Sequence, residues 1–248
     1  MKPKVAFFDF AGCEGCQLQI VNLEETILDL ASKVEVVNFR EAISERGEDY
    51  SIAFVEGSIT RQADEERLRG IREKASILVA LGACACTGGI NALKNFQDME
   101  EIKKIVYGKN SLYFDTYPAR PLHAVVPVDY DIRGCPINKN EFLKVTTALL
   151  LGKKPETPNY PVCVECKLKE NTCVFEKGMF CLGPVTRAGC DAACPSCNSN
   201  CEGCRGLVDD PNTNAQKDIL QKYGLTMEEA VGKFRIFDGY LEVAKCMI

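Results

Sequence analysis

Short apolar runs alternate with helix-like segments in the first half of the chain. Four of the runs have the composition of buried parallel strands, and they lie at 5–10, 34–39, 52–55 and 77–81. Helical spacing of apolar residues predicts helices at 18–31, 63–75 and 140–151. This alternation predicts an α/β fold, in which an open, flavodoxin-like parallel sheet carries helices on both faces.

The second half shows little periodicity before a helix expected at 214–223, which Gly224 ends. Thr226 and Glu229 then form a capping box for a short last helix. Because the stretch 163–206 is too irregular to hold itself by a core, bound metal is its natural organiser. The Pro/Gly-rich segment 152–158 predicts a boundary between a flavodoxin-like domain, 1–155, and an irregular Cys-rich domain, 156–248.

Fifteen cysteines and a single histidine change this picture, since ten of the cysteines lie in the second half. The first residues show no secretion signal and no apolar window reaches membrane-spanning length, so we expect a cytoplasmic chain. Reduced compartments do not keep disulfides, and soft thiolate ligands select zinc or iron–sulfur clusters. The net charge of −5 argues against a nucleic-acid partner.

Four cysteines of the first half follow predicted strands: Cys13, Cys16, Cys84 and, after the apolar stretch 125–132, Cys135. The carboxyl ends of parallel strands share one edge of a sheet, so these four thiolates could hold one [4Fe–4S] cluster there. Flanking glycines would let the backbone approach a bulky inorganic core. The alternative interpretation is that Cys84 and Cys135 are small core residues.

The second half contains one set of four cysteines and one set of five. The first set is Cys163, Cys166, Cys173 and Cys181, and the second is Cys190, Cys194, Cys197, Cys201 and Cys204. Zinc also binds four thiolates, so these spacings alone leave two structural zinc sites open as an alternative.

Several motifs resemble those of [NiFe] hydrogenase small subunits, in the same order along nearly the whole chain. They are Cys13-x2-Cys16, Gly82-Ala-Cys84 with Gly88-Gly89, Gly134-Cys135-Pro136, Cys181-Leu-Gly-Pro followed by Cys190, and Cys201-x2-Cys204. Cys16-Gln17-Leu18-Gln19 and 161–166 are most similar to the delta-type subunits of soluble, NAD(P)-linked sulfhydrogenases.

The resemblance implies three [4Fe–4S] clusters, a proximal one in the first domain and a medial and a distal one in the second. The implied ligands are Cys13, Cys16, Cys84 and Cys135 (proximal), Cys190, Cys194, Cys201 and Cys204 (medial), and Cys163, Cys166, Cys173 and Cys181 (distal). Cys194 stands where membrane-bound relatives carry a proline beside a three-iron cluster, which favours it over Cys197 as the fourth medial ligand.

Five residues remain outside these sets. We expect Cys86, Cys197 and Cys246 to be spare thiols and His123 to be structural or solvated. Glu56 is either a strand-end polar residue or an acidic residue near the proximal cluster, and both interpretations stay open.

The resemblance implies an electron-transferring subunit of a cytoplasmic hydrogenase. A [NiFe] large subunit would carry the catalytic site, and a flavin- and NAD(P)-binding or ferredoxin-type subunit would exchange the electrons. This chain has no GxGxxG or Walker A loop, so we expect no nucleotide or flavin in it. The alternatives are a subunit like the 20 kDa subunit of respiratory complex I and a zinc-stabilised binding module.

Overall fold

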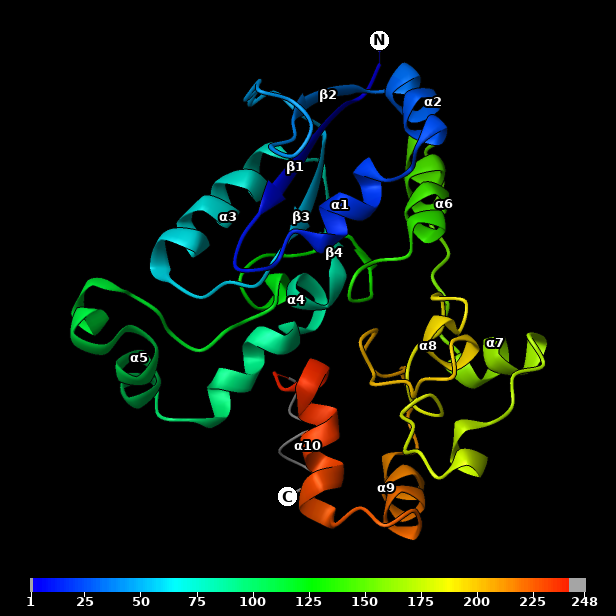
Figure 1. Cartoon of the computed structure of the whole chain (residues 1–248). Helices are drawn as coiled ribbons and strands as arrows, with labels where there is room; N and C mark the ends of the chain where they lie inside the picture. The colour runs from blue at the N-terminus through cyan, green and yellow to red at the C-terminus, as the bar shows by residue number, and fades with distance from the viewer. Residues whose placement is uncertain (1, 241–248) are drawn as a thin grey trace.

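The computed structural model describes residues 2–240, so Cys246 lies outside the described part of the chain. Five parallel strands form one sheet in the order β2-β1-β3-β4-β5 (Figure 1). The strands are β1 Lys4–Asp9, β2 Glu35–Asn38, β3 Ile52–Glu56, β4 Ile77–Leu81 and β5 Tyr130–Ile132. This order is that of flavodoxin-like folds, so the predicted fold class is confirmed.

Helices cover both faces of the sheet. The helices of this half of the chain are α1 Gly15–Val21, α2 Glu25–Lys33, α3 Gln62–Lys74, α4 Gly82–Thr87, α5 Met99–Tyr107 and α6 Lys139–Leu150, with the 3₁₀ helices η1 Gly89–Phe96, η2 Gly108–Tyr113 and η3 Leu122–Ala124. Of these, α5 projects away from the sheet and buries none of its residues. Phe54 of β3 packs against Phe142 of α6 on one face, with ring centroids 5.3 Å apart. Val55 points to the other face, where it joins the core that contains Leu68 of α3.

Two elements differ from the sequence predictions. The single helix expected at 18–31 is broken into α1 and α2, because Glu24 adopts a positive φ of 53°. Leu18 and Leu28, two of the apolar residues whose spacing predicted the single helix, are 46% and 71% exposed. The apolar stretch 125–132 contributes only the three-residue strand β5.

The Cys-rich part contains only short regular elements before its two last helices. The short elements are α7 Val162–Leu168, η4 Val174–Lys177 and α8 Ala193–Ser196, and the last helices are α9 Thr213–Lys222 and α10 Met227–Asp238. The predicted capping box of Thr226 and Glu229 is confirmed at the start of α10, although this helix is longer than expected. It runs back toward the sheet, where the Thr87 hydroxyl lies 2.6 Å from the Phe237 carbonyl oxygen (Figure 1).

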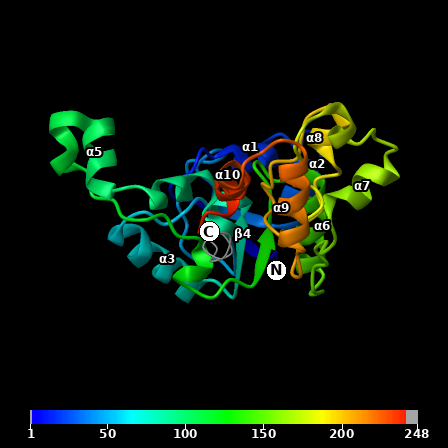
Figure 2. The same cartoon turned by 90° about the horizontal axis from the view of Figure 1, so that it is seen from below.

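The two parts of the chain are therefore packed together through α10 as well as joined in sequence. Figure 2 shows α5 projecting to one side of this body, opposite the Cys-rich part. Within residues 2–240, every helix is too short or too polar to cross a lipid bilayer.

Candidate functional site

The proximal cysteines meet at the carboxyl edge of the sheet. Cys13 lies in the loop after β1 and Cys16 in the first turn of α1, while Cys84 lies on α4 and Cys135 in the turn after β5. Burial raises the pKa of the Cys84 thiol to about 12, and the nearby sulfurs of Cys135 and Cys13 contribute to the rise. The structure thus brings the predicted proximal group together, with Cys13 and Cys135 exposed at its outer side.

Two glycines leave room for these sulfurs. A Cβ atom on Gly82 would lie 2.3 Å from the Cys16 sulfur, and one on Gly89 would lie 3.0 Å from the Cys84 sulfur. Both glycines also have positive φ angles, of 81° and 54°. A larger residue at either place would displace a predicted ligand.

Glu56 holds the start of the helix that carries Cys16. Its buried carboxylate accepts hydrogen bonds from the backbone N–H groups of Cys16, at 3.1 Å, and Gln17, at 2.9 Å. Burial raises the pKa of Glu56, whereas these two bonds lower it. Glu56 is therefore both a strand-end residue and a neighbour of the proximal group, because β3 ends beside α1.

The medial cysteines share one cavity. Cys190, Cys194, Cys201 and Cys204 line a space of about 610 Å³, and Cys135 reaches its edge. The described residues around this space include Cys194 but not Cys197, which is exposed at the end of α8. The geometry therefore agrees with the choice of Cys194, rather than Cys197, as the fourth medial ligand.

The distal cysteines gather around α7. Burial raises the pKa of Cys163 to about 11, and the sulfurs of Cys181, Cys166 and Cys173 raise it further. A Cβ atom on Gly183 would lie 3.3 Å from the Cys181 sulfur and 3.6 Å from the Cys163 sulfur. As in the proximal group, a glycine keeps the space between two thiols free.

Neighbouring groups touch at two places. Burial raises the pKa of Cys204 to about 12, and the backbone of Cys135 lies close enough to bond to its sulfur and lower the pKa. Cys201 and Cys181 lie in one buried cluster, and the Cys201 carbonyl oxygen accepts a hydrogen bond from the Leu182 N–H at 2.9 Å. The proximal group therefore adjoins the medial group, which in turn adjoins the distal group.

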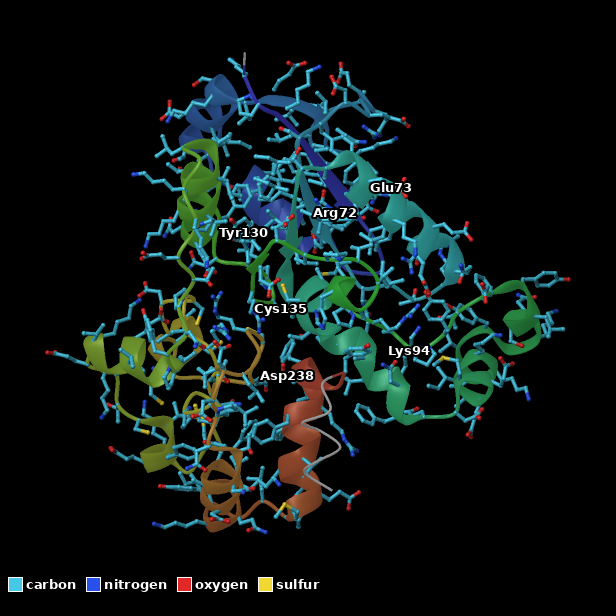
Figure 3. All side chains as sticks on the ribbon, turned by 180° about the vertical axis from the view of Figure 1, so that it is seen from behind. Arg72, Glu73, Lys94, Tyr130, Cys135 and Asp238 are labelled. Carbon is cyan, nitrogen blue, oxygen red and sulfur yellow. The ribbon has the colours of Figure 1, made fainter. Side chains whose placement is uncertain are left out.

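Figure 3 shows the molecule from behind, with Cys135 and Asp238 labelled. Cys135 lies below the sheet, and Asp238 lies at the end of α10 that faces it.

Three polar residues near the cysteines were not predicted. Glu165, between two distal cysteines, accepts hydrogen bonds from the N–H groups of Gly189, at 2.8 Å, and Ala192, at 3.0 Å, in the medial loop. Arg205 and Glu141 form a buried ion pair at 2.7 Å. Their partners are distant in sequence, so no local pattern indicates these roles.

The described residues that were expected to be spare or structural lie outside the three groups. Cys86 is buried beneath the sheet edge, 3.7 Å from the Ala80 carbonyl oxygen. His123 lies on η3 with its ring exposed, 6.3 Å from the ring of Tyr240. Both positions agree with the predicted structural or solvated roles.

The donor sets fit iron–sulfur clusters. The proximal and distal groups each offer four thiols beside space that glycines keep open, and the four medial thiols line a cavity. Four thiolates are the donors that a [4Fe–4S] cluster requires. The groups are loose assemblies: among residues 2–240, no three His, Cys, Asp or Glu side chains lie close enough together to hold a single metal ion.

Comparisons with known proteins identify the family. Residues 13–149 match the family described as NADH ubiquinone oxidoreductase, 20 Kd subunit. The sulfhydrogenase 2 delta subunit of Pyrococcus furiosus is 37% identical over 236 residues, which cover 94% of this chain and 98% of that one. A vhu subunit of the F420-non-reducing hydrogenase of Methanocaldococcus jannaschii is 34% identical, covering 83% of this chain and 82% of its own.

A solved structure supports the same family. The structure of NAD⁺-reducing [NiFe]-hydrogenase in the H₂-reduced state matches with a TM-score of 0.57 and 29% identity, over 64% of this chain and 96% of that one. The 20 kDa subunit family covers only the first half, so it does not by itself separate the hydrogenase interpretation from the complex I alternative. The sulfhydrogenase and vhu relatives extend through the Cys-rich half and favour the hydrogenase interpretation. The chain therefore belongs to the NADH ubiquinone oxidoreductase 20 kDa subunit family, in the branch that contains the sulfhydrogenase delta and vhu hydrogenase subunits.

Proposed function

We propose that this chain relays electrons within a [NiFe] hydrogenase complex and holds three [4Fe–4S] clusters. When bound, each cluster would supply a one-electron carrier. The ligands are Cys13, Cys16, Cys84 and Cys135 for the proximal cluster, Cys190, Cys194, Cys201 and Cys204 for the medial cluster, and Cys163, Cys166, Cys173 and Cys181 for the distal cluster. The observation that carries the proposal is the row of cysteine groups, in which Cys204 adjoins Cys135 and Cys201 adjoins Cys181.

The chain's own residues determine the setting of each cluster. Cys16, Cys181 and Cys201 are buried, so they would keep water from the inner side of each site. Hydrogen bonds near cluster sulfurs and burial are the main means by which a protein adjusts reduction potential. The Gly183 N–H, 3.4 Å from the Cys181 sulfur, is one such donor.

The two ends of the row would face different partners. A large subunit with the nickel–iron site would cover the proximal end, where Cys13 and Cys135 are exposed. A flavin- and NAD(P)-binding or ferredoxin-type subunit would approach the distal end, where Cys163, Cys166 and Cys173 are partly exposed. We place the complex in the cytoplasm, where thiols stay reduced.

Metal analysis of the native complex tests this function. The complex is purified without oxygen, its iron, sulfide and zinc are counted, and its chains are identified by mass. We expect at least twelve iron atoms per copy of this chain, because the partner chains add iron to the twelve held here, together with no zinc bound to this chain and a co-purifying chain that carries nickel. Stoichiometric zinc with little iron would contradict the proposal.

A further inference from the structure

One buried guanidinium lies where the two halves of the chain meet. The side chain of Arg205 is 2% exposed, and its Nη1 and Nη2 atoms each donate to the Glu141 carboxylate at 2.7 Å. Nη1 also donates to the Arg133 carbonyl oxygen, and Nε donates to the Ala188 carbonyl oxygen at 2.6 Å. A single rigid group therefore binds three separate segments of the chain.

Each of these segments leads to a predicted cluster ligand or to the sheet. Arg133 lies two residues before Cys135, whose sulfur belongs to the proximal group. Ala188 lies two residues before Cys190 of the medial group, and Arg205 itself follows Cys204. Glu141 stands in the first turn of α6, which the core of the sheet domain holds in place.

Gly189 supports this arrangement independently. A Cβ atom on Gly189 would lie 2.2 Å from Nη2 of Arg205 and 2.8 Å from Oε1 of Glu141. The residue before the medial ligand Cys190 therefore leaves space for the ion pair. The Glu165 carboxylate binds the Gly189 N–H at 2.8 Å, so this segment is held on two sides.

Stability alone gives a poor account of such a pair. Apolar residues of similar volume often replace a buried ion pair at no cost in stability, since desolvating two charges offsets their attraction. A guanidinium, by contrast, presents its donors in one plane with fixed angles, so it can fix the relative positions of the groups that it binds. Lysine has the same charge but lacks this planar set of donors.

We propose that Arg205 is a positioning residue that fixes the separation between the proximal and medial clusters. The proposal rests on the function proposed above. The proximal ligand turn and both medial ligand loops are bonded through this side chain, and α6 anchors it to the sheet. Without the guanidinium, these loops could shift relative to one another although every cluster ligand is still present.

The test uses the complete complex, reduced without oxygen, and compares Arg205→Lys with Arg187→Lys. Arg187 is the matched control, because it lies beside Ala188 in the same loop and is also ion-paired, to Asp209, but its side chain binds the Pro158 carbonyl and does not connect this loop to the proximal turn or to α6. Three quantities are measured: iron content, the unfolding temperature, and the EPR spin–spin interaction between the reduced proximal and medial clusters. Arg205→Lys should keep its iron, change the interaction spectrum and slow reduction of the distal cluster severalfold. Arg187→Lys should match the wild type.

A second variant covers the case in which Arg205→Lys loses iron or fails to fold. Glu141→Leu combined with Arg205→Met leaves no unpaired charge, so it separates positioning from charge burial. Full iron with an altered interaction spectrum supports the proposal. Full iron with a wild-type spectrum in either variant overturns it, and so does loss of iron from both. A wild-type complex without three interacting clusters would instead contradict the proposed function.

Discussion

The predicted medial ligands differ in how the protein encloses them. Cys201 is buried and Cys204 is partly buried, whereas Cys194 is exposed on the four-residue helix α8. Burial raises the pKa of Cys194, and the nearby charges of Glu202 and Cys197 raise it further. Cys194 is therefore the medial thiol that the surrounding protein encloses least. We expect the iron atom that it binds to be the one that the medial cluster loses most readily.

Replacing Cys194 and Cys197 by alanine in separate variants tests which of the two binds the medial cluster. Cys194→Ala should give an oxidised three-iron EPR signal and a higher medial reduction potential, because a cubane corner without a thiolate tends to lose its iron. Cys197→Ala is the matched control and should leave both unchanged, since its thiol is exposed and lies outside the cavity lining. A three-iron signal from the Cys197 variant alone would reverse the assignment.

Asp238 is a second residue whose surroundings predict a measurable effect. Burial raises the pKa of this carboxyl to about 7, although the Arg133 guanidinium lowers it. Its Oδ1 atom has no hydrogen-bond partner among the described residues. The ordinary pKa of an aspartate is near 4, so the folded chain holds a proton here that the unfolded chain releases.

The sign of the pH dependence follows from this difference. Asp238 contributes stability that is fully present below about pH 4 and is lost as the pH rises to about 7. Between pH 5 and 6, wild-type unfolding free energy should therefore fall, relative to Asp238→Asn, by about 1.2 kcal/mol per pH unit, and less steeply toward pH 7. Denaturant unfolding of both proteins without oxygen measures it, with the exposed Asp210→Asn as control. Parallel curves for wild type and Asp238→Asn would refute the prediction.

At the scale of the elements, the sheet was predictable because its apolar runs are local. The strands expected at 52–55 and 77–81 match β3 and β4 within one residue, and α3 lies where the helix at 63–75 was expected. The break between α1 and α2 was not predictable, because the apolar pattern continues across Glu24 while the backbone does not. The structure likewise places α5 in a segment with no buried residue, where periodicity gives little information.

The candidate site was predictable to a different degree. In the second half the spacing of the cysteines indicated one set of four and one of five, because cluster ligands recur there in short local motifs. The proximal four are far apart in sequence, and their positions after strands indicated that group. The residues that fix these groups relative to each other were missed. Arg205 and Glu141 are 64 positions apart in sequence, and only the fold brings them together.

Helix α5 and the following η2 form an arm, residues 99–113, that exposes apolar side chains among charged ones. Ile105, Leu112 and Tyr113 on it are 75%, 88% and 84% exposed, which is unusual for side chains so close together. Figures 1 and 2 show this arm projecting from the body of the molecule. It follows η1, which begins beside Cys84 and exposes Ile90, so the apolar surface continues to the proximal group. We therefore expect the large subunit to cover the arm.

Charged substitutions on the arm should weaken assembly. In co-expressed complexes, Ile105→Asp combined with Leu112→Asp should reduce the large subunit that co-purifies with this chain, because a carboxylate would be buried without a partner. Leu28→Asp is the matched control, since Leu28 is 71% exposed on α2 at the other end of the sheet. Undiminished co-purification of the large subunit with the arm variant would show that something else covers this surface.

At the scale of the whole molecule, the two halves are stabilised by different means. The sheet half has two large apolar cores, one on each face. One of the two small cores in the Cys-rich half consists largely of candidate ligands and their neighbours, with Cys181 and Cys201 among them. For such a segment the free energy of metal binding is also folding free energy.

Removal of iron should therefore unfold the molecule unevenly. After anaerobic chelation of the complex, hydrogen exchange should accelerate across 162–206, because thiols freed of metal leave this segment without a sufficient core. Peptides from β1, β3 and α3 should keep their protection, since their core contains no iron-dependent contact beyond Cys16. Helix α10 should show an intermediate response, because it packs on Leu220 and Leu182 at one side and contacts Thr87 at the other. Equal loss of protection in both halves would show that the clusters stabilise the sheet as well, and unchanged exchange in 162–206 would show that this segment folds without them.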